Sequence, residues 1–353
     1  MRGDKMIDTI YICNRFNTYN EFEIIKNTLD NHIRSNIAKS KKTLHSDKKR
    51  KNSYITYAFS DIGFQEIVMV KNFNRGYFAI EIKLRPKLLI DKNYINVTYL
   101  QEFKDISKRF DDTFKEIGIA VPNFYSWFVR RIDYAVDIKV NPDIIQIYLQ
   151  MFKLGNIPEK LLNDNLDYFD KDNNFYLRSK NYTINFYDRY TTLQNKKKEK
   201  NKAFYDIEKA KGIMRFEVQV TVNTNKLKKM KLISENKLSE FLNLKLCRHY
   251  IIGNFEKLIG AGDYHSLTGA LEKISNKTKR KLIKDISKNG MQDAKYEIGD
   301  KKFSKLINDL RKKNINPVTI PEELKLTELK SLLPKINDAI SDELLIRIKR
   351  RKI

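Results

Sequence analysis

The sequence predicts an α+β protein, with a mixed or antiparallel sheet in the first two thirds and a mainly helical C-terminal part. Segments rich in β-branched and aromatic residues, bounded by Asn, Gly, Asp or Lys, recur up to about residue 225. Beyond that point, apolar residues recur at a spacing near 3.6 and strand-like segments disappear. We therefore expect two domains, residues 1–225 and 226–353, and 41% hydrophobic residues are enough to give them real cores.

The strands expected in the first domain are short and lie between helical patterns. They cover residues 9–13, 54–60, 64–70, 77–84, 128–140, 182–188 and 214–222. Helices are expected over residues 19–38, 99–118, 142–154 and 196–212, the third of which opens with a proline suited to a first turn. The basic segment 39–51 is expected to be a loop. In the second domain, helices are expected over residues 237–259, 266–288, 302–313 and 322–350.

The charge of the chain favours a polyanionic partner. Lys and Arg number 69 against 44 Asp and Glu, which gives a net charge of +25, and binding of such residues to phosphates releases condensed counterions. A Lys-, Asn- and Ile-rich composition can also reflect an AT-rich genome, but such a bias would not hold the acidic residues so far behind. Nucleic acid is therefore the expected partner.

The sequence also argues against a membrane protein and against a secreted protein. No apolar run approaches the roughly 18 residues that span a bilayer, and residues 1–7 contain no apolar signal core. Cys13 and Cys247 match no metal or disulfide pattern. A reducing cytoplasm is the expected location, with no membrane partner.

Acidic residues lie within strands that are otherwise apolar. Alternation in the strand 128–140 places Arg131, Asp133 and Asp137 on one face and Tyr134 on the other. Carboxylates in such a strand are costly unless they are solvated, paired or bound to metal. One interpretation is that Arg131 pairs with Asp133 or Asp137 on an open sheet face.

Two further strands repeat this design. Arg215, Glu217 and Gln219 share one face of the strand 214–222, and Glu81 shares a face with Lys83 in the strand 77–84. Carboxylate oxygens are the preferred ligands of hard divalent cations. The pattern therefore favours a site for Mg²⁺ or Mn²⁺, although spacing alone does not show that the strands converge.

One tyrosine lies on a polar strand face. In the segment 182–188 alternation places Tyr187 with Thr183, Asn185 and the following Arg189. A tyrosine attacks phosphorus only when its hydroxyl is activated and the developing charge is neutralised, which metal and arginine can do. The rivals are Tyr176, Tyr182 and Tyr190. Tyr182 should face away from Tyr187, and so should Tyr190 unless the strand ends at Asp188.

In this order, the strands resemble the gene II/gene X family of filamentous-phage and plasmid replication initiators. The segment 78–87 (FAIEIKLRPK) is similar to the family's VEIKxSPxK strand, Arg131-Ile132-Asp133 to its RID motif, residues 183–189 to its tyrosine segment, and Arg215-Phe216-Glu217 to its VRFEARI strand. The family's own beginning resembles residues 6–10, and residues 310–315 are a weaker match to a late segment. The likeness covers residues 6–230.

The resemblance implies an enzyme that nicks and rejoins one strand of duplex origin DNA to begin rolling-circle replication. Tyr187 would be the nucleophile that forms a 5′-phosphotyrosine link, and Asp133 and Glu217 would hold the metal, with Glu81 or Asp137 as further ligands. The arginines that could bind phosphate, or only fix the carboxylates, are Arg131, Arg189 and Arg215. Implied partners are double-stranded origin DNA, single-stranded DNA, and the helicase and polymerase of a bacterial host cell.

The chain departs from the replication nucleases that bind metal through a His-hydrophobe-His motif. Its four histidines stand alone in the sequence, and His249 is expected on a helix surface. This fits a branch of initiators that use carboxylates.

Two basic runs are candidates for following the DNA backbone. Lys196, Lys197, Lys198 and Lys200 come shortly after Tyr187, and Lys48, Lys49 and Arg50 lie in the expected loop 39–51. The ordinary interpretation of such a run is a solvated face. The aromatic residues Phe124, Tyr125 and Trp127 are expected to pack in a core rather than to stack on bases.

Other functions remain open at this point. A conjugative relaxase would use the same chemistry, a nuclease could use water in place of tyrosine, and a non-enzymatic DNA-binding regulator would need the acidic strands only for structure. The C-terminal helices could form a bundle or a module like a winged helix-turn-helix.

Overall fold

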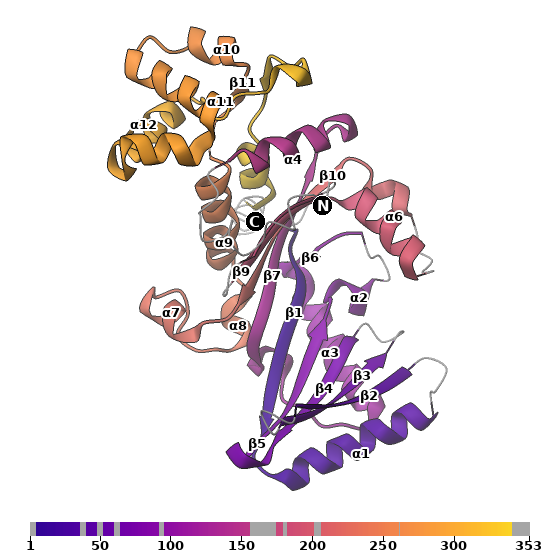
Figure 1. Cartoon of the computed structure of the whole chain (residues 1–353). Coiled ribbons are helices and arrows are strands. Elements are labelled where there is room, and N and C mark those ends of the chain that lie inside the picture. The colour runs from indigo at the N-terminus through magenta and orange to yellow at the C-terminus, as the bar shows by residue number, and fades with distance from the viewer. Residues whose placement is uncertain are drawn as a thin grey trace, which may run out of the picture. The chain divides into compact units, whose positions relative to one another are not determined.

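The computed structural model describes residues 5–35, 40–47, 52–59, 64–91, 95–155, 174–178, 182–200, 206–260 and 262–340 (Figure 1). It confirms the α+β class, because a large antiparallel sheet occupies the N-terminal part and the C-terminal part is mainly helical. No helix in these ranges is both long and apolar enough to cross a bilayer.

The large sheet has ten strands among the described residues, in the order β2-β3-β4-β5-β1-β7-β10-β9-β8, with β6 paired to β1. Hydrogen bonds from Val140 N–H to Gly212 O and from Val222 N–H to Arg130 O flank β7 and β10 and make that pair antiparallel. The strands are β1 (Lys5–Phe16), β2 (Ser40–Asp47), β3 (Asn52–Phe59), β4 (Phe64–Asn72), β5 (Tyr77–Leu84), β6 (Thr98–Tyr99), β7 (Phe128–Lys139), β8 (Asn174–Arg178), β9 (Tyr182–Asp188) and β10 (Ile213–Thr221).

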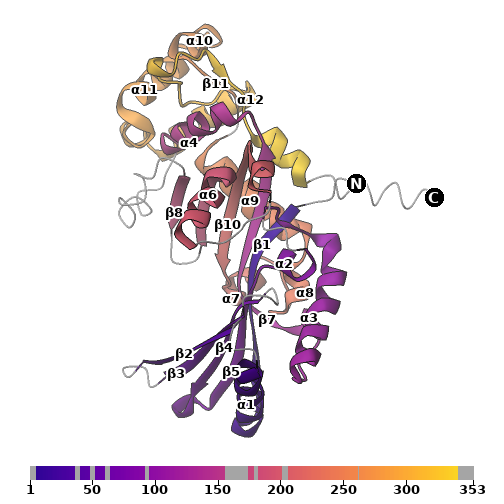
Figure 2. The same ribbon diagram turned by 90° about the vertical axis from the view of Figure 1, so that its right-hand side faces the viewer.

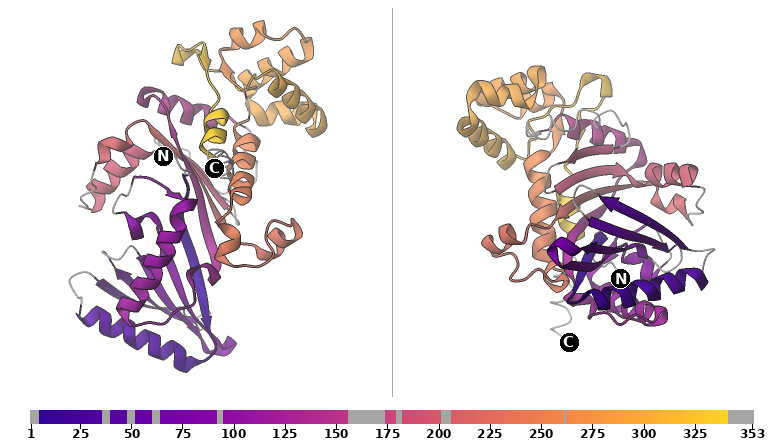
Figure 3. Two further views of the ribbon diagram at one scale, coloured as in Figure 1. Left: turned by 180° about the vertical axis from the view of Figure 1, so that it is seen from behind. Right: turned by 60° about the horizontal axis from the view of Figure 1, so that its bottom comes forward.

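Helices follow the apolar periodicity of the sequence in both halves of the chain. They are α1 (Tyr19–Ser35), α2 (Lys87–Ile90), α3 (Phe103–Ile117), α4 (Ile145–Lys153), α6 (Arg189–Lys200), α7 (Thr224–Lys229), α8 (Leu238–Phe241), α9 (Leu244–Leu258), α10 (Leu267–Glu272), α11 (Lys277–Ile298) and α12 (Asp300–Lys312). A short pair, β11 (Tyr264–His265) and β12 (Glu328–Leu329), lies beside α10, α11 and α12 (Figures 1 and 3).

The chain divides into two compact units, and neither is continuous in sequence. The first unit combines Met1–Ala135 with Glu217–Cys247, and the second combines Val136–Phe216 with Arg248–Lys352. The division runs through β7 and β10, each of which contributes residues to both units. It differs from the expected boundary at residue 225, because each unit takes segments from both sides of that position.

The core of the first unit is built from aromatic residues around α3. Phe64 of β4 contacts Phe110 and Phe114 of α3 at centroid distances of 5.5 and 5.3 Å. Trp127 packs edge-on against Phe110, and its indole N–H donates to Pro122 O at 3.1 Å. Trp127 is therefore a core residue, as expected from the sequence. Figure 2 shows α1 and α3 beside the strands of this unit.

The core of the second unit is a set of phenylalanines beneath β9 and β10. Phe186 stacks on Phe216 at 3.9 Å between ring centroids, and Phe152 of α4 and Phe255 of α9 pack against this pair. These contacts place the even-numbered residues of both strands on the core face. The odd-numbered residues, among them Tyr187 and Arg215, consequently lie on the opposite face.

Several predicted segments differ from the structure. The described end of the helix expected over 196–212 is a 3₁₀ turn (Ile207–Ala210), and the single helices expected over 237–259 and 266–288 are each divided, into α8 and α9 and into α10 and α11. Most of the basic segment expected to be a loop is β2, which pairs along its whole length with β3, since pairing to a well-formed neighbour overrides the low strand propensity of lysine. The helix expected over 322–350 is wrong in its first part. There the chain forms a 3₁₀ turn (Glu322–Leu324) and then β12, and a helix occupies residues 333–340, where the described residues end.

Candidate active site

Asp133 is the centre of a buried group of charges in the first unit. It lies on β7 opposite Thr9 of β1, and it is 1% exposed. Arg131, two residues earlier on the same face, donates through Nε to Oδ1 at 2.7 Å and through Nη2 to Oδ2 at 2.6 Å. This bidentate pair is one of the two pairings that the sequence left open.

Two more carboxylates lie close enough to Asp133 to act on its charge. They are Glu217 of β10, which is 5% exposed, and Asp8 of β1, which is 7% exposed. Asp8 accepts a hydrogen bond from Thr9 Oγ1 at 2.9 Å, and Arg85 Nη2 approaches its Oδ2 to 3.7 Å. The structure therefore brings Asp133 and Glu217 together, as expected, and adds Asp8.

Sequence reasoning missed Asp8 because a β-bulge places it. The pairing of β1 with β7 shifts between Ile7 and Thr9, so Asp8 is an extra residue in the ladder. Simple alternation does not predict where such a residue points. The available signal was an acidic residue within the mostly apolar segment 6–10.

The electrostatics of this group show a shortage of positive charge. Burial raises the pKa of the Asp133 carboxyl, the Arg131 guanidinium opposes that change, and the negative charges of Glu217 and Asp8 add to it. The net effect raises the pKa of Asp133 to about 7. Arg131, whose side chain is 32% exposed, and Arg85, 3.7 Å from Asp8, therefore do not offset the effect of burial and of the two neighbouring carboxylates on Asp133.

The chemistry of these side chains fits a hard divalent cation, because oxygen ligands and unbalanced negative charge are what Mg²⁺ and Mn²⁺ require. The geometry is not yet that of a coordination sphere. Within the described ranges, no three acidic, histidine or cysteine side chains are placed so as to hold a metal. Both oxygens of Asp133 accept hydrogen bonds from Arg131, so a cation would have to displace one of them.

Glu81, the third predicted ligand, has other partners in the first unit. Its carboxylate accepts a hydrogen bond from Tyr11 Oη at 2.5 Å and lies 3.3 Å from Arg130 Nη2. Burial and the neighbouring Glu81 raise the pKa of Tyr11. Glu217 in turn accepts a hydrogen bond from Gln219 Nε2 at 2.8 Å. A role for Glu81 as a metal ligand stays a prediction.

In the second unit, Asp137 and Arg215 form a buried ion pair. Arg215 Nε and Nη2 lie 2.7 and 3.0 Å from the two carboxylate oxygens. The side chains are 3% and 0% exposed. Arg215 and Arg131 each therefore fix a carboxylate, which is the second of the two roles considered for these arginines.

Tyr187 lies on the predicted face of β9. It pairs with Asn174 of β8, and Phe186 beside it points into the phenylalanine core. Tyr187 is 7% exposed. Phe216 stacks on Phe186, so Tyr187 and Arg215 lie on the same face of neighbouring strands in the second unit.

The strand ends at Asp188, which changes the environment of the next residues. Asp188 accepts hydrogen bonds from Tyr190 N and Thr191 Oγ1 at 3.0 and 2.6 Å, and α6 begins at Arg189. Arg189 is consequently a buried first-turn residue, 1% exposed, and not part of the strand face that was expected.

Tyr190 is therefore not excluded by strand register. Its hydroxyl donates to Glu208 Oε1 at 2.9 Å, which raises its pKa. It is also more accessible than Tyr187. Tyr190 stays a rival nucleophile.

Only part of the predicted basic runs falls within the described residues. The backbone of Lys196, Lys197, Lys198 and Lys200 belongs to α6, but their side chains lie outside the described residues. Lys48, Lys49 and Arg50 lie wholly outside them. His249 is exposed on α9, as expected.

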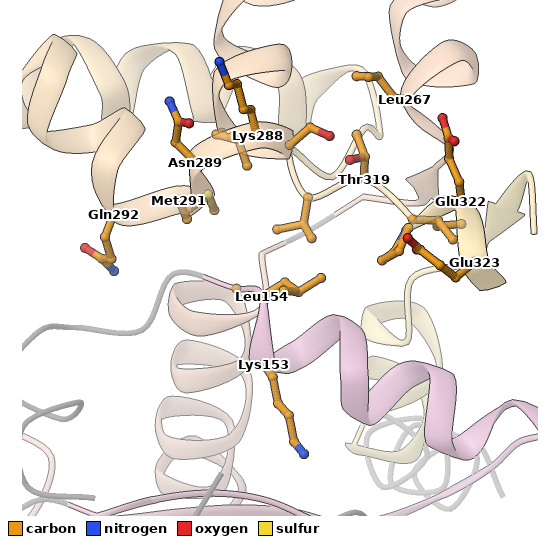
Figure 4. Close-up of a pocket in the computed structure, with 17 residues that line it drawn as sticks. Lys153, Leu154, Leu267, Lys288, Asn289, Met291, Gln292, Thr319, Glu322 and Glu323 are labelled. Carbon is orange, nitrogen blue, oxygen red and sulfur yellow. The ribbon is translucent and has the colours of Figure 1, made fainter. Parts of the chain in front are cut away.

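A pocket of about 670 Å³ lies elsewhere in the second unit (Figure 4). Its walls come from the end of α4, the segment around Gly290 within α11, and residues 318–323. Leu154 and Thr319 face it in the close-up, whereas Lys153 points away. None of the predicted catalytic or metal-binding residues lines it.

No protein-family model matches the chain, and comparison with characterised proteins finds no significant match.

Proposed function

We propose that the chain is a metal-dependent DNA strand transferase that nicks and rejoins one strand of origin DNA through a 5′-phosphotyrosine link, and so initiates rolling-circle replication. The observation that carries the proposal is the buried group of Asp133, Glu217 and Asp8, in which burial and the neighbouring negative charges raise the pKa of Asp133 although Arg131 pairs with it. The surplus of basic residues and the resemblance to phage and plasmid initiators support the same function.

The reaction is a transesterification and needs no co-reactant. The tyrosine oxygen forms a bond to phosphorus, the bond from phosphorus to the 3′ oxygen breaks, and the hydroxyl proton is transferred in net terms to that oxygen. The free 3′-hydroxyl then serves a polymerase, and reversal of the step rejoins the strand. A bound divalent cation would draw charge from the scissile phosphate and lower the barrier to attack.

Particular residues carry the parts of this reaction. Tyr187 would supply the oxygen, and Asp133, Glu217 and Asp8 would hold the cation. Arg131 holds both oxygens of Asp133, and if a cation were bound by Asp133 the guanidinium could instead bind phosphate. The carboxylates belong to the first unit and Tyr187 to the second.

Incubation with supercoiled DNA from the region that flanks the gene tests the proposal. In Mg²⁺ we expect a nicked circle with protein on its 5′ end, and in EDTA none. Tyr187→Phe should abolish the adduct because it removes the attacking oxygen, whereas Tyr190→Phe, the matched control three residues away, should keep it. An adduct formed by Tyr187→Phe but not by Tyr190→Phe would transfer the role of nucleophile to Tyr190.

A non-enzymatic DNA-binding regulator is the second candidate, and a specific observation favours it. Arg131 and Arg215 pair bidentately with Asp133 and Asp137, which is what purely structural carboxylates would do. Such a protein would bind DNA equally well in EDTA and would form no covalent product with any substrate. A nuclease that uses water would cut DNA in Mg²⁺ without remaining attached.

A further inference from the structure

The first three turns of α11 carry lysines along one side. Lys277, Lys281, Lys284 and Lys288 follow the spacing i, i+4, i+7, i+11, which places them on a single helix face. All four are exposed. We call these four residues the lysine face.

The opposite side of the helix fixes the direction in which the lysine face points. Leu282, Ile283 and Ile286 are buried, at 2%, 0% and 5% exposure. The helix also begins at a defined place, because the side chain of Asn276 caps its first turn by accepting from Lys279 N. The lysine face is therefore held outward by packing on the other side.

Neighbouring basic residues of the same helix have structural partners. Lys279 forms an ion pair with Asp309 of α12 at 3.0 Å. Arg280 Nη1 donates to the carbonyl oxygens of Leu271 and Ile274, at the end of α10. In contrast, no ion pair involves the lysine face among the described residues, and Asp285 is the single acidic residue between Lys277 and Lys288.

The lysine face ends where the helix breaks. Gly290 has φ 85° and ψ 172°, which interrupts the helical path. Beyond it the exposed residues include Asp293 and Glu297. The concentration of positive charge is thus confined to the N-terminal half of α11.

The dimensions of this face match duplex DNA. Eleven residues of helix extend about 16 Å, and successive phosphates of one strand are displaced by roughly 3.4 Å along the axis of a duplex. A helix of about 10–12 Å diameter also fits the major groove, which is about 12 Å wide. The connection from α10 to α11 is short, as in helix pairs that present their second helix to DNA.

We propose that the lysine face of α11 binds the phosphate backbone of duplex DNA, independently of metal and of the tyrosine. Lysine is a point charge with no fixed pattern of donors, so these contacts supply affinity and not sequence discrimination. The inference concerns binding alone and does not depend on the nicking reaction.

Equilibrium binding of the full-length chain to a random 25-base-pair duplex in EDTA tests the inference. The variant replaces all four residues with glutamine (Lys277→Gln, Lys281→Gln, Lys284→Gln and Lys288→Gln), which preserves helix propensity. Each phosphate contact contributes about 0.9 to the slope of log affinity against log salt. We therefore expect the slope to fall by roughly 3 to 4 and the affinity at about 0.1 M salt to fall at least tenfold.

A matched control removes the same charge from the neighbouring helix. Lys301, Lys302, Lys305 and Lys312 are exposed on α12, and their replacement by glutamine should change the slope by less than about 1, since long-range attraction alone is lost. Thermal unfolding checks that both variants fold. Equal losses in the two variants, or no loss in the first, would overturn the inference. Duplex binding through the lysine face without any covalent adduct would support it and reject the nicking proposal instead.

Discussion

At the scale of single residues, the protonation of Asp133 affects the metal binding that we propose for the first unit. A buried carboxylate beside two others is stable as the neutral acid, and burial with the charges of Glu217 and Asp8 raises its pKa to about 7. A cation competes with the proton for the same oxygens. Metal binding should therefore strengthen as the pH rises above the ordinary range of an aspartate.

The same shift predicts how stability depends on pH. Between pH 4 and 7 the folded chain holds a proton on Asp133 that the unfolded chain has lost, so the free energy of unfolding falls as the pH rises through this range. Asp133→Asn removes this fall in the free energy of unfolding, because an amide does not ionise. In EDTA at pH 8 the variant should unfold at a higher temperature than the wild type. Its free energy of unfolding should be higher by up to a few kcal/mol.

Two comparisons make this measurement decisive. At pH 4.5 the two proteins should unfold at nearly the same temperature, because the carboxyl is then protonated in the folded state. Mg²⁺ at pH 8 should stabilise the wild type and leave Asp133→Asn unchanged. A wild-type unfolding temperature that is constant from pH 5 to 8, with equal effects of Mg²⁺ on both proteins, would refute the proposed role of Asp133.

At the scale of secondary structure, the pair of Asp137 and Arg215 joins β7 to β10 within the second unit. Asp137→Ala removes the carboxylate that pairs with Arg215, whose charged guanidinium has 0% exposure. Breaking such a buried pair costs about 3–5 kcal/mol. Urea unfolding should show this loss. Asp143→Ala at an exposed position should change stability by less than about 0.5 kcal/mol, and a loss for Asp137→Ala no larger than this would show that the pair contributes little.

The alternation of apolar and polar residues along the sequence predicted many of the strands and their apolar faces. The strands at 77–84 and 182–188 have the expected bounds, and the stacked rings of Phe186 and Phe216 confirm which faces of β9 and β10 are apolar. Alternation failed where the backbone departs from it, at the bulge that places Asp8. It also could not show which arginine neutralises which carboxylate, because that depends on pairing between distant strands.

The strand β2 was missed for a different physical reason. Its sequence is rich in lysine and serine, so local propensity favours a loop, and only pairing with β3 makes it a strand. Conversely, the long apolar periodicity after residue 322 suggested one helix. The structure instead uses its first part for a 3₁₀ turn and the short strand β12.

At the scale of the whole molecule, the two units do not correspond to the two halves of the chain. Tyr134 donates its hydroxyl to Phe241 O at 2.9 Å within the first unit, and Phe255 packs on Phe216 within the second. Both contacts connect the sheet to residues beyond 225. The C-terminal segment is therefore needed to complete each core.

A chain that ends at residue 225 should consequently fail to fold cooperatively. Removal of α8 and α9 uncovers apolar side chains in both units, including Tyr134 and Phe216. We expect broad thermal unfolding and rapid cleavage in limited proteolysis, compared with a sharp transition for the full chain. A cooperative transition in the shortened chain would show that residues 1–225 form an independent domain, as the sequence alone suggests.

The interleaving of the units also has a consequence for synthesis. The first unit cannot close when residue 135 has been made, because Glu217–Cys247 is still to come. At roughly 5–20 residues per second, a ribosome takes about 4–16 s to add the intervening segment Val136–Phe216. During that delay the edge of β7 that later pairs with β10 is available to chaperones. Neither core is complete until the later part of the chain has been synthesised.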